Sequence, residues 1–306
     1  MSFLKPASSP LRLTDFRMQS CPELAADPGL LAILKTTALV ESRADNYAEY
    51  LHAVFQPRDH RWREAIEGWN QEERQHGILL RNLVVAADPD FDFDSAMQHY
   101  RATVPYHACD GCSVRGTIAD ELVARCVVEA LASTFYRTLK DGARTPVLRA
   151  ALVALARDEA RHYGMFAAML REEQEGPNAL GRWRCCWVGI RRMTELGDQQ
   201  IIGAYISAAR AVSGGRSPAL AAQRYAAALF PRYRFHHLRF AARLICPVLF
   251  GRSDAMTVNL FALALRVGVM MKGLVARGQV SALSRVRALL GEKAAGWAGK
   301  AISSKG

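Results

Sequence analysis

The chain has 306 residues, of which half are hydrophobic and 23 % are charged. This composition excludes a disordered chain and suffices for one large domain or two modest ones. The net charge is +11, and an excess of this size points to acidic partners or anionic surfaces.

The first residues and the cysteines bear on the compartment. The stretch MSFLKPASSPLRLTDF has no long apolar run and no small-residue cleavage pattern, so we expect no secretory signal and a cytoplasmic protein. The seven cysteines are scattered and odd in number, which suits a reducing compartment. Cys109 and Cys112 form a lone CDGC pair, which we interpret as a loop with two thiols, because a zinc or rubredoxin site needs a second pair.

The spacing of apolar residues predicts an almost entirely helical chain. Long segments rich in Ala, Leu, Arg and Glu carry apolar residues three and four positions apart, and Gly- and Pro-containing stretches separate these segments. Four long helices are expected at about 29–55, 59–86, 115–140 and 145–174. Further helices are expected over SPALAAQRYAAALF and after Ser253.

The first and third of these helices each place a single glutamate in an apolar stripe. Glu41 follows Leu34 and Ala38 on one face of the first helix. Glu129 follows Leu122 and Cys126 in the same way on the third helix. Asp45, one turn after Glu41, is the alternative to it.

The second and fourth helices each place a Glu-x-x-His motif in an apolar stripe. Glu73 and His76 share a face with Trp69 and Leu80, and Glu159 and His162 continue an equivalent stripe on the fourth helix. Glu73 lies 32 residues after Glu41, and Glu159 lies 30 residues after Glu129. The pattern is therefore an inward glutamate followed by Glu-x-x-His, found twice. Glu72 is a weaker alternative to Glu73.

Four inward carboxylates need compensating cations. Burying even one unpaired carboxylate costs several kcal/mol. Four carboxylates and two imidazoles form the ligand set of a dinuclear carboxylate centre in a four-helix bundle. Oxygen ligands with one imidazole per metal favour iron or manganese over structural zinc. The expected ligands are Glu41, Glu73, His76, Glu129, Glu159 and His162.

These residues resemble the ferritin-like di-iron carboxylate superfamily, and within it the acyl-carrier-protein desaturases. That family carries W-x-x-E-E-x-x-H-G on its second helix and D-E-x-R-H on its fourth. The matching residues here are Trp69, Glu72, Glu73, His76 and Gly77, then Asp158, Glu159, Arg161 and His162. The resemblance covers about residues 30–175. It implies an all-α fold, a ferritin-like four-helix bundle with a buried dinuclear site, followed here by additional C-terminal helices.

The resemblance also implies roles for residues beside the ligands. Asp158 would accept a hydrogen bond from His76, and Glu72 one from His162. Trp69 would lie on an electron path or simply pack in the core. The family's threonine three residues after the third-helix glutamate is replaced by Ala132, so Ser133 is the expected hydroxyl facing the site.

An O2-activating di-iron oxidase is the function that this resemblance implies. It would desaturate or hydroxylate an organic substrate, either a small molecule or an acyl group on a carrier protein. The expected cofactors are two Fe ions, with Mn/Fe as the alternative pair, O2 as co-substrate and an external electron-donor protein. The alternative function is iron handling or peroxide removal, as in ferritins and rubrerythrins. The superfamily often forms homodimers.

The basic part of the chain suggests a partner surface. Residues 1–175 hold 20 Lys and Arg against 25 Asp and Glu, and residues 176–306 hold 20 against 4, so we expect a boundary between domains 1–175 and 176–306. The basic region suits an acidic carrier protein or an anionic membrane, at whose inner face the protein would be peripheral. PRYRFHHLRFAARLICPVLFGR has an interfacial composition, and the segment after Ser253 is expected to be a buried or interfacial helix. No nucleic-acid motif accompanies the charge.

Overall fold

The computed structural model describes Phe3 and residues 22–105, 111–177, 179–195, 199–210 and 218–276. These residues form an all-α structure without a β-strand, apart from an isolated bridge between Ser113 and Gly116. The helices are α1 (Pro22–Ala26), α2 (Pro28–Glu41), α3 (Ala44–Val54), α4 (His60–Ala87), α5 (Phe93–Thr103), α6 (Ile118–Gly142), α7 (Pro146–Gln174), α8 (Arg182–Thr194), α9 (Gln199–Arg210), α10 (Pro218–Leu229), α11 (Phe235–Phe250) and the helix Ala255–Ala276.

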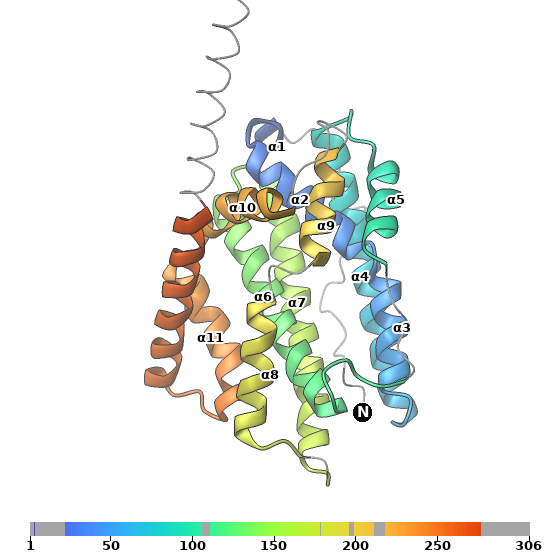
Figure 1. Ribbon diagram of the computed structural model, residues 1–306, viewed down its shortest axis with the longest axis vertical. Helices are drawn as coiled ribbons and strands as arrows, with labels where there is room; N and C mark the ends of the chain where they lie inside the picture. Colours follow the sequence, from blue (N-terminus) through green and yellow to red (C-terminus); the bar gives the residue numbers. More distant parts are fainter. Residues whose placement is uncertain are drawn as a thin grey trace, which may run out of the picture.

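Four long stretches of helix form the centre of the molecule, namely α4, α6, α7 and the pair α2 and α3, which together make the fourth stretch. In Figure 1, α4, α6 and α7 run along the long axis, and α2 and α3 follow one another beside α4. Local sequence explains where the long helices begin. The side chain of Asp59 accepts from Arg61 N–H at the start of α4, Thr117 and Asp120 form a capping box at the start of α6, and Pro146 occupies the first turn of α7.

Three of the four predicted long helices are confirmed to within three residues at each end. The exception is the segment 29–55, which the structure divides at Ser42 and Arg43 into α2 and α3. No Gly or Pro marks this break in the sequence. Tertiary contacts explain it: the Arg43 guanidinium donates to the carbonyl of Val104, and Ser42 packs against Gly77 of α4.

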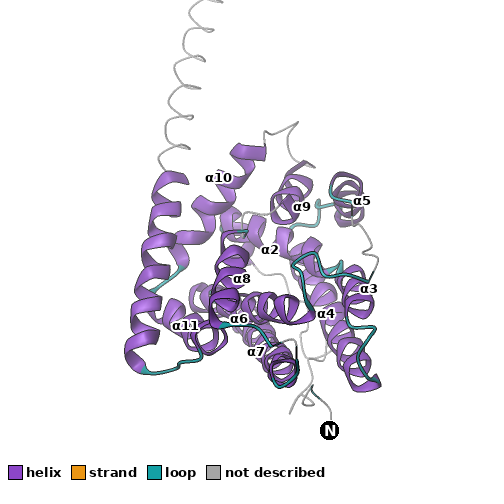
Figure 2. Ribbon diagram, turned by 60° about the horizontal axis from the view of Figure 1, so that its bottom comes forward, coloured by secondary structure: helices purple, strands orange, loops and turns teal. Residues whose placement is uncertain are grey.

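The helices after residue 176 lie against the central four rather than apart from them. Contacts join α8 and α11 to α6, α9 to α2 and α5, and α10 to α2. The second view shows α8 and α11 beside α6, with α9 and α10 at the far end (Figure 2). The domain boundary near residue 175 stays a prediction. Within the segment 231–252, α11 buries eight side chains, among them Ile245 and Leu249, against its neighbours, and the interfacial role of the segment stays a prediction.

The apolar core has two parts along the bundle. One gathers around Leu34, Leu80 and Leu152, at the end of the bundle where α1 and α10 lie in Figure 1. The other gathers around Ile66, Leu122 and Phe166. Since these residues precede and follow Glu41, Glu73, Glu129 and Glu159 on their helices, the acidic side chains form a polar layer between two apolar ones.

Candidate metal centre

The structure brings together all six side chains that the sequence predicts as metal ligands. The two Glu-x-x-His motifs come from the middle of α4 and α7, where the three-residue step places both side chains of each motif on the inward face. Glu129 comes from α6, and Glu41 is the last residue of α2. Five of the six are buried, and Glu41 is partly exposed.

The ligand atoms form two overlapping groups. In each group, atoms from four residues all lie within 4.8 Å of one another. Glu41 and His76 belong to the first group, and Glu129 and His162 belong to the second. Both groups share Glu73 and Glu159. Two carboxylates common to both groups, with one further carboxylate and one imidazole for each, form an arrangement that could hold two metal ions through bridging carboxylates.

The two imidazole rings are aligned for metal binding. The Nε2 atom of His162 lies 2.8 Å from Glu72 Oε2, and that of His76 lies 3.4 Å from Asp158 Oδ2. The Nδ1 atoms of both rings point into the carboxylate cluster, and neither makes a hydrogen bond within the structure as described. The Nδ1 of His162 is 2.9 Å from Glu73 Oε1 without hydrogen-bonding geometry.

Buried Nδ1 atoms without a hydrogen bond are costly, and a ligand explains them. An unsatisfied buried polar atom costs roughly 1–3 kcal/mol. A metal ion at Nδ1 would use its lone pair, while the carboxylate at Nε2 would keep the proton on that nitrogen. The donor set therefore fits a pair of metal ions.

Arg161 links the two carboxylates that support the imidazoles. Its guanidinium donates to both oxygens of Glu72, at 3.1 and 3.0 Å, and to Asp158 Oδ1 at 2.6 Å. Burial alone would raise the pKa of Glu72 and Asp158, but the partner histidine and Arg161 outweigh it and lower both. Both groups are therefore held as hydrogen-bond acceptors.

Tyr136 is a further member of the site, which was not among the residues expected there from the sequence. Its hydroxyl donates to Glu41 Oε1 at 2.6 Å, and its ring is fully buried. The signal was present in the sequence, because Tyr136 lies seven residues, two helical turns, after Glu129. A phenol buried at that spacing needs a hydrogen-bond partner, and the site provides one.

The four glutamates of the cluster repel one another, and the two histidines attract them, so their pKa values shift in opposite directions. Burial, followed by the charges of Glu73 and Glu159, raises the pKa of Glu41 and of Glu129 well above the usual value. For Glu73, His76 and His162 outweigh the effect of burial and lower the pKa. The pKa of Glu159 is also lowered, because both histidines outweigh burial and the Glu73 charge. Such a cluster needs bound cations, either protons or metal ions.

The two other residues predicted to act at the site are close to it. Trp69 is buried, and its ring centroid lies 6.4 Å from that of His162 in an edge-on arrangement. Ser133 is fully buried, and its hydroxyl donates to the carbonyl of Ala156 at 2.7 Å. The serine proton is therefore committed to the α7 backbone, and only its lone pairs remain for another group.

Asp45, the alternative to Glu41, lies outside the cluster. It begins α3 beyond the break after Glu41, and its exposed carboxylate binds Arg74 and Asn70. The expectation that Asp45 and Glu41 share one helix face is wrong, because the helix does not continue through Ser42 and Arg43.

A pocket of about 520 Å³ opens beside the cluster. Glu41 and Gly77 line its inner side, and Ile78, Phe93 and Met97 give it apolar walls. Arg74 and Arg81 also line it, paired with Asp45 and Asp94. Its volume is typical of a small-molecule site, and Glu41 is the ligand that it reaches.

A third group of potential ligands comprises Asp141, His236 and His237. The Nε2 atoms of the histidines lie 2.9 and 2.8 Å from Asp141 Oδ2. The Nδ1 of His237 accepts the backbone N–H of Arg234, so Nε2 carries the proton and donates to Asp141. This group is a hydrogen-bonded contact between α6 and α11, and His237 Nε2 has no lone pair for a metal. Of the CDGC pair, Cys109 lies outside the described residues and Cys112 is exposed.

Fold and site together define an all-α protein with a candidate dinuclear metal centre. In comparisons with known proteins, no family model matches the chain and no curated protein is significantly similar to it.

Proposed function

We propose that this protein is an O2-activating di-iron oxidase built on a ferritin-like four-helix bundle. The observation that carries the proposal is the pair of overlapping ligand groups, which share Glu73 and Glu159. Each group ends in a buried Nδ1 atom that has no hydrogen-bond partner within the described part of the chain. Both Nδ1 atoms lie 2.9–3.6 Å from oxygens of the shared carboxylates Glu73 and Glu159, where bound metal ions would give them a partner.

Iron is the metal that the donor set favours. Glu41, Glu73 and His76 would hold one ion, and Glu129, Glu159 and His162 the other, with Glu73 and Glu159 shared. Carboxylate oxygen and imidazole nitrogen suit Fe and Mn, and no thiolate is among the donors. When bound, a ferrous pair supplies electrons to O2 and oxidising power toward an unactivated C–H bond.

The protein would prepare the site in three ways. Asp158 and Glu72 fix the orientation of the imidazoles, and Tyr136 fixes the carboxylate of Glu41. The apolar clusters on both sides keep bulk water from the polar layer. The pocket beside Glu41 would receive an organic substrate, with Ile78, Phe93 and Met97 against its apolar part.

The overall reaction requires an outside reductant. One O2, two electrons and two protons are consumed for each substrate oxidised. Hydroxylation transfers one oxygen atom to the substrate and releases one water, whereas desaturation removes two hydrogens from the substrate and releases two waters. An electron-donor protein is therefore a partner that the proposal needs.

Mössbauer spectroscopy on protein loaded anaerobically with iron-57 tests this function. We expect two coupled ferrous ions per chain that are oxidised within seconds of an O2 pulse. Mononuclear iron, or slow growth of a mineral-like ferric signal, would contradict an oxidase and favour iron handling.

Ligand variants test the assignment independently of activity. Glu159→Ala removes a carboxylate that both groups share, and His162→Ala removes a ligand of one group. We expect Glu159→Ala to lose both ions and His162→Ala to lose at least one, with helical content unchanged by circular dichroism. Asp45→Ala is the control and should keep both ions. Full metal content of Glu159→Ala in elemental analysis would refute the assignment.

A further inference from the structure

The helix Ala255–Ala276 exposes an apolar face. Of the described helices, it alone is long and apolar enough to cross a membrane, yet only 17 % of its most apolar window is buried. The exposed face follows steps of four and three residues, which place its side chains in one stripe. The stripe consists of Met256, Leu260, Leu263, Val267, Met270 and Leu274, each more than half exposed.

The opposite face attaches this helix to the rest of the protein. Val258 and Ala262 are buried against Ala242 and Cys246 of α11, and the rings of Phe250 and Phe261 meet edge to face at 5.5 Å. The helix is therefore anchored along one side. A stripe of this length left in water is unfavourable, so it indicates an interaction surface.

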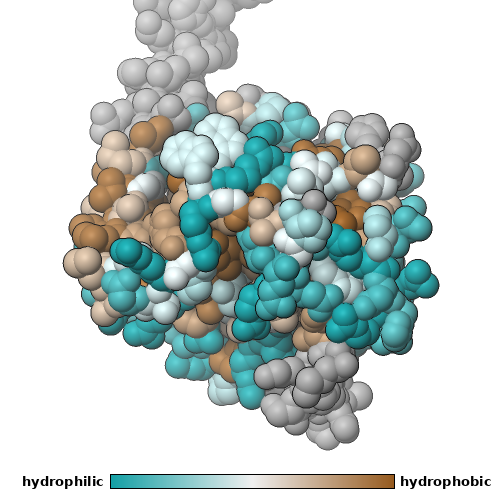
Figure 3. Space-filling model, turned by 90° about the horizontal axis from the view of Figure 1, so that it is seen from below, coloured by the Kyte–Doolittle hydropathy of each residue, from teal (hydrophilic) through white to brown (hydrophobic). Residues whose placement is uncertain are grey.

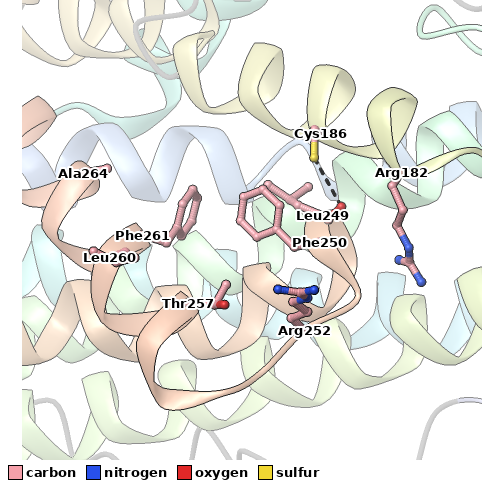
Figure 4. A pocket seen from close by; sticks show the side chains of 9 residues that line it. All are labelled: Arg182, Cys186, Leu249, Phe250, Arg252, Thr257, Leu260, Phe261 and Ala264. Carbon is pink, nitrogen blue, oxygen red and sulfur yellow. Dashed lines mark hydrogen bonds between the residues drawn. The ribbon is translucent and has the colours of Figure 1, made fainter.

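A groove continues this surface toward α8. It has a volume of about 540 Å³ and lies between α8, α11 and the helix Ala255–Ala276. Figure 4 shows the rings of Phe250 and Phe261 at its centre, with Arg252 below them and Arg182 to one side. In Figure 3, apolar atoms gather on the left of the molecule, where this helix and α11 lie.

The exposed face of α8 has the composition of a membrane interface. Trp183 is 82 % exposed, and Trp187 and Ile190 follow it at steps of four and three residues. Indole rings prefer the boundary between lipid headgroups and acyl chains. Cys186, one residue before Trp187, lines the groove, so the tryptophan face borders it.

The charges around the stripe are basic. Arg182 and Arg252 line the groove, and neither forms a salt bridge among the residues described, although Arg252 lies near the Asp254 carboxylate. The helix itself has Arg266 and Lys272 and no acidic residue. The sequence that follows it, residues 277–306, adds six Lys and Arg and the single acidic residue Glu292.

We propose that this face docks on the surface of an anionic phospholipid bilayer. The helix Ala255–Ala276 lies along the interface with its stripe among the acyl chains, and Arg182, Arg252 and Arg266 contact lipid phosphates. A second copy of the chain fits less well, because a helix without acidic residues offers no partner to Arg266 or Lys272. An acidic carrier protein would match the charge but leave the stripe exposed. The inference stands independently of the metal centre.

Vesicle flotation of the full-length protein tests this proposal. We expect the protein to float with vesicles of phosphatidylcholine and phosphatidylglycerol, to float weakly with phosphatidylcholine alone, and to be released as salt is raised. Failure to float with the anionic vesicles would overturn the proposal. Equal binding to both compositions would overturn the role assigned to the arginines.

A double variant locates the binding face. Leu263→Glu with Val267→Glu places charge at the centre of the stripe without touching the buried side, and we expect binding to the anionic vesicles to fall at least about tenfold. Val114→Glu is the matched control, since Val114 is 74 % exposed on the loop before α6, and it should bind normally. Sedimentation of the same proteins without lipid tests whether a second copy of the chain, rather than a bilayer, covers the stripe. A dimer of the unaltered protein that the double variant dissociates would overturn the proposal.

Discussion

In each imidazole of the candidate centre, the Nε2 atom lies beside a carboxylate that fixes the ring. The Nδ1 atom of the same ring points into the carboxylate cluster. Asp158 serves His76 in this way, and Glu72 serves His162. The two motifs thus support each other. Asp158, which precedes Glu159 on α7, lies beside the histidine of α4, and Glu72, which precedes Glu73 on α4, lies beside the histidine of α7. Arg161 joins both supports.

The supporting carboxylates should tune metal affinity without being ligands. We expect Asp158→Asn and Glu72→Gln each to weaken iron binding by roughly 10–100-fold while two ions still bind at saturation. Competition with a chelator of known affinity measures this. Asp45→Asn is the control carboxylate, and its affinity should not change. A loss of stoichiometry instead of affinity would make these residues ligands.

At the scale of elements, the close approach of α4 to the break between α2 and α3 positions Glu41. A Cβ added at Gly77 would lie 3.1–3.2 Å from Ser42 atoms, two of which belong to the backbone. Gly164 of α7 is helical as well, but a Cβ there would meet nothing within 4 Å. These two glycines therefore differ only in what surrounds them.

Substituting both glycines separates packing from helix propensity. Gly164→Ala should stabilise the protein by about 1 kcal/mol, which is the propensity gain. Gly77→Ala should destabilise it by about 1–2 kcal/mol, because forcing α4 away from Ser42 costs more than the propensity gain. Urea unfolding of the metal-free protein measures both. Equal stabilisation by the two substitutions would show that α4 and Ser42 separate without cost.

The segment before α6 is held by a buried carboxylate. Glu121 accepts from the hydroxyls of Tyr50 and Ser113 and from Arg125. Burial would raise its pKa, but Arg125 and the hydrogen bonds outweigh it, so the pKa of Glu121 is below its usual value of 4.5. A lowered native pKa means that this contribution to stability is complete above pH 4.5 and is lost as the pH falls further.

The variant Glu121→Gln should therefore be less stable than the unaltered protein by about 3 kcal/mol at pH 7, since it leaves the partly buried Arg125 without its partner. The difference should shrink below pH 4.5. Thermal melting between pH 7 and pH 3.5 measures this, with Glu64→Gln on the exposed face of α4 as the control. A difference that is constant with pH would contradict the assigned ionisation.

At the scale of the whole molecule, a layer of charge divides the apolar core in two. Four carboxylates and two imidazoles occupy the middle of the bundle, where the apolar layers on either side exclude water. The fold without metal therefore carries an internal cost, which bound cations would offset.

Removal of the metal ions should lower the stability of the unaltered protein. At a free ferrous concentration of a hundred times the dissociation constant, each site adds about 2.7 kcal/mol, so two sites should raise the melting temperature by several degrees. Anaerobic melting with and without a chelator measures the shift. Glu159→Ala should not respond to iron, and an equal shift in that variant would place the bound iron elsewhere.

The sequence alone determined the helical class, three of the four long helices, and the six residues that converge. These follow from local rules, because a three- or four-residue step decides which side chains share a helix face. The pairing of Asp158 with His76 and of Glu72 with His162 came from the resemblance to the di-iron carboxylate family, and the structure places these residues side by side.

Only the tertiary structure decided the break at Ser42, which carries Asp45 away from the cluster, and the hydrogen bond from Tyr136. It also decided that α11 buries one side against its neighbours while the stripe of Ala255–Ala276 faces outward, although both segments are apolar and basic. The physical reason is common to all of these features. Each depends on which element packs against which, and contacts between residues far apart in the chain leave no mark in the local spacing of side chains.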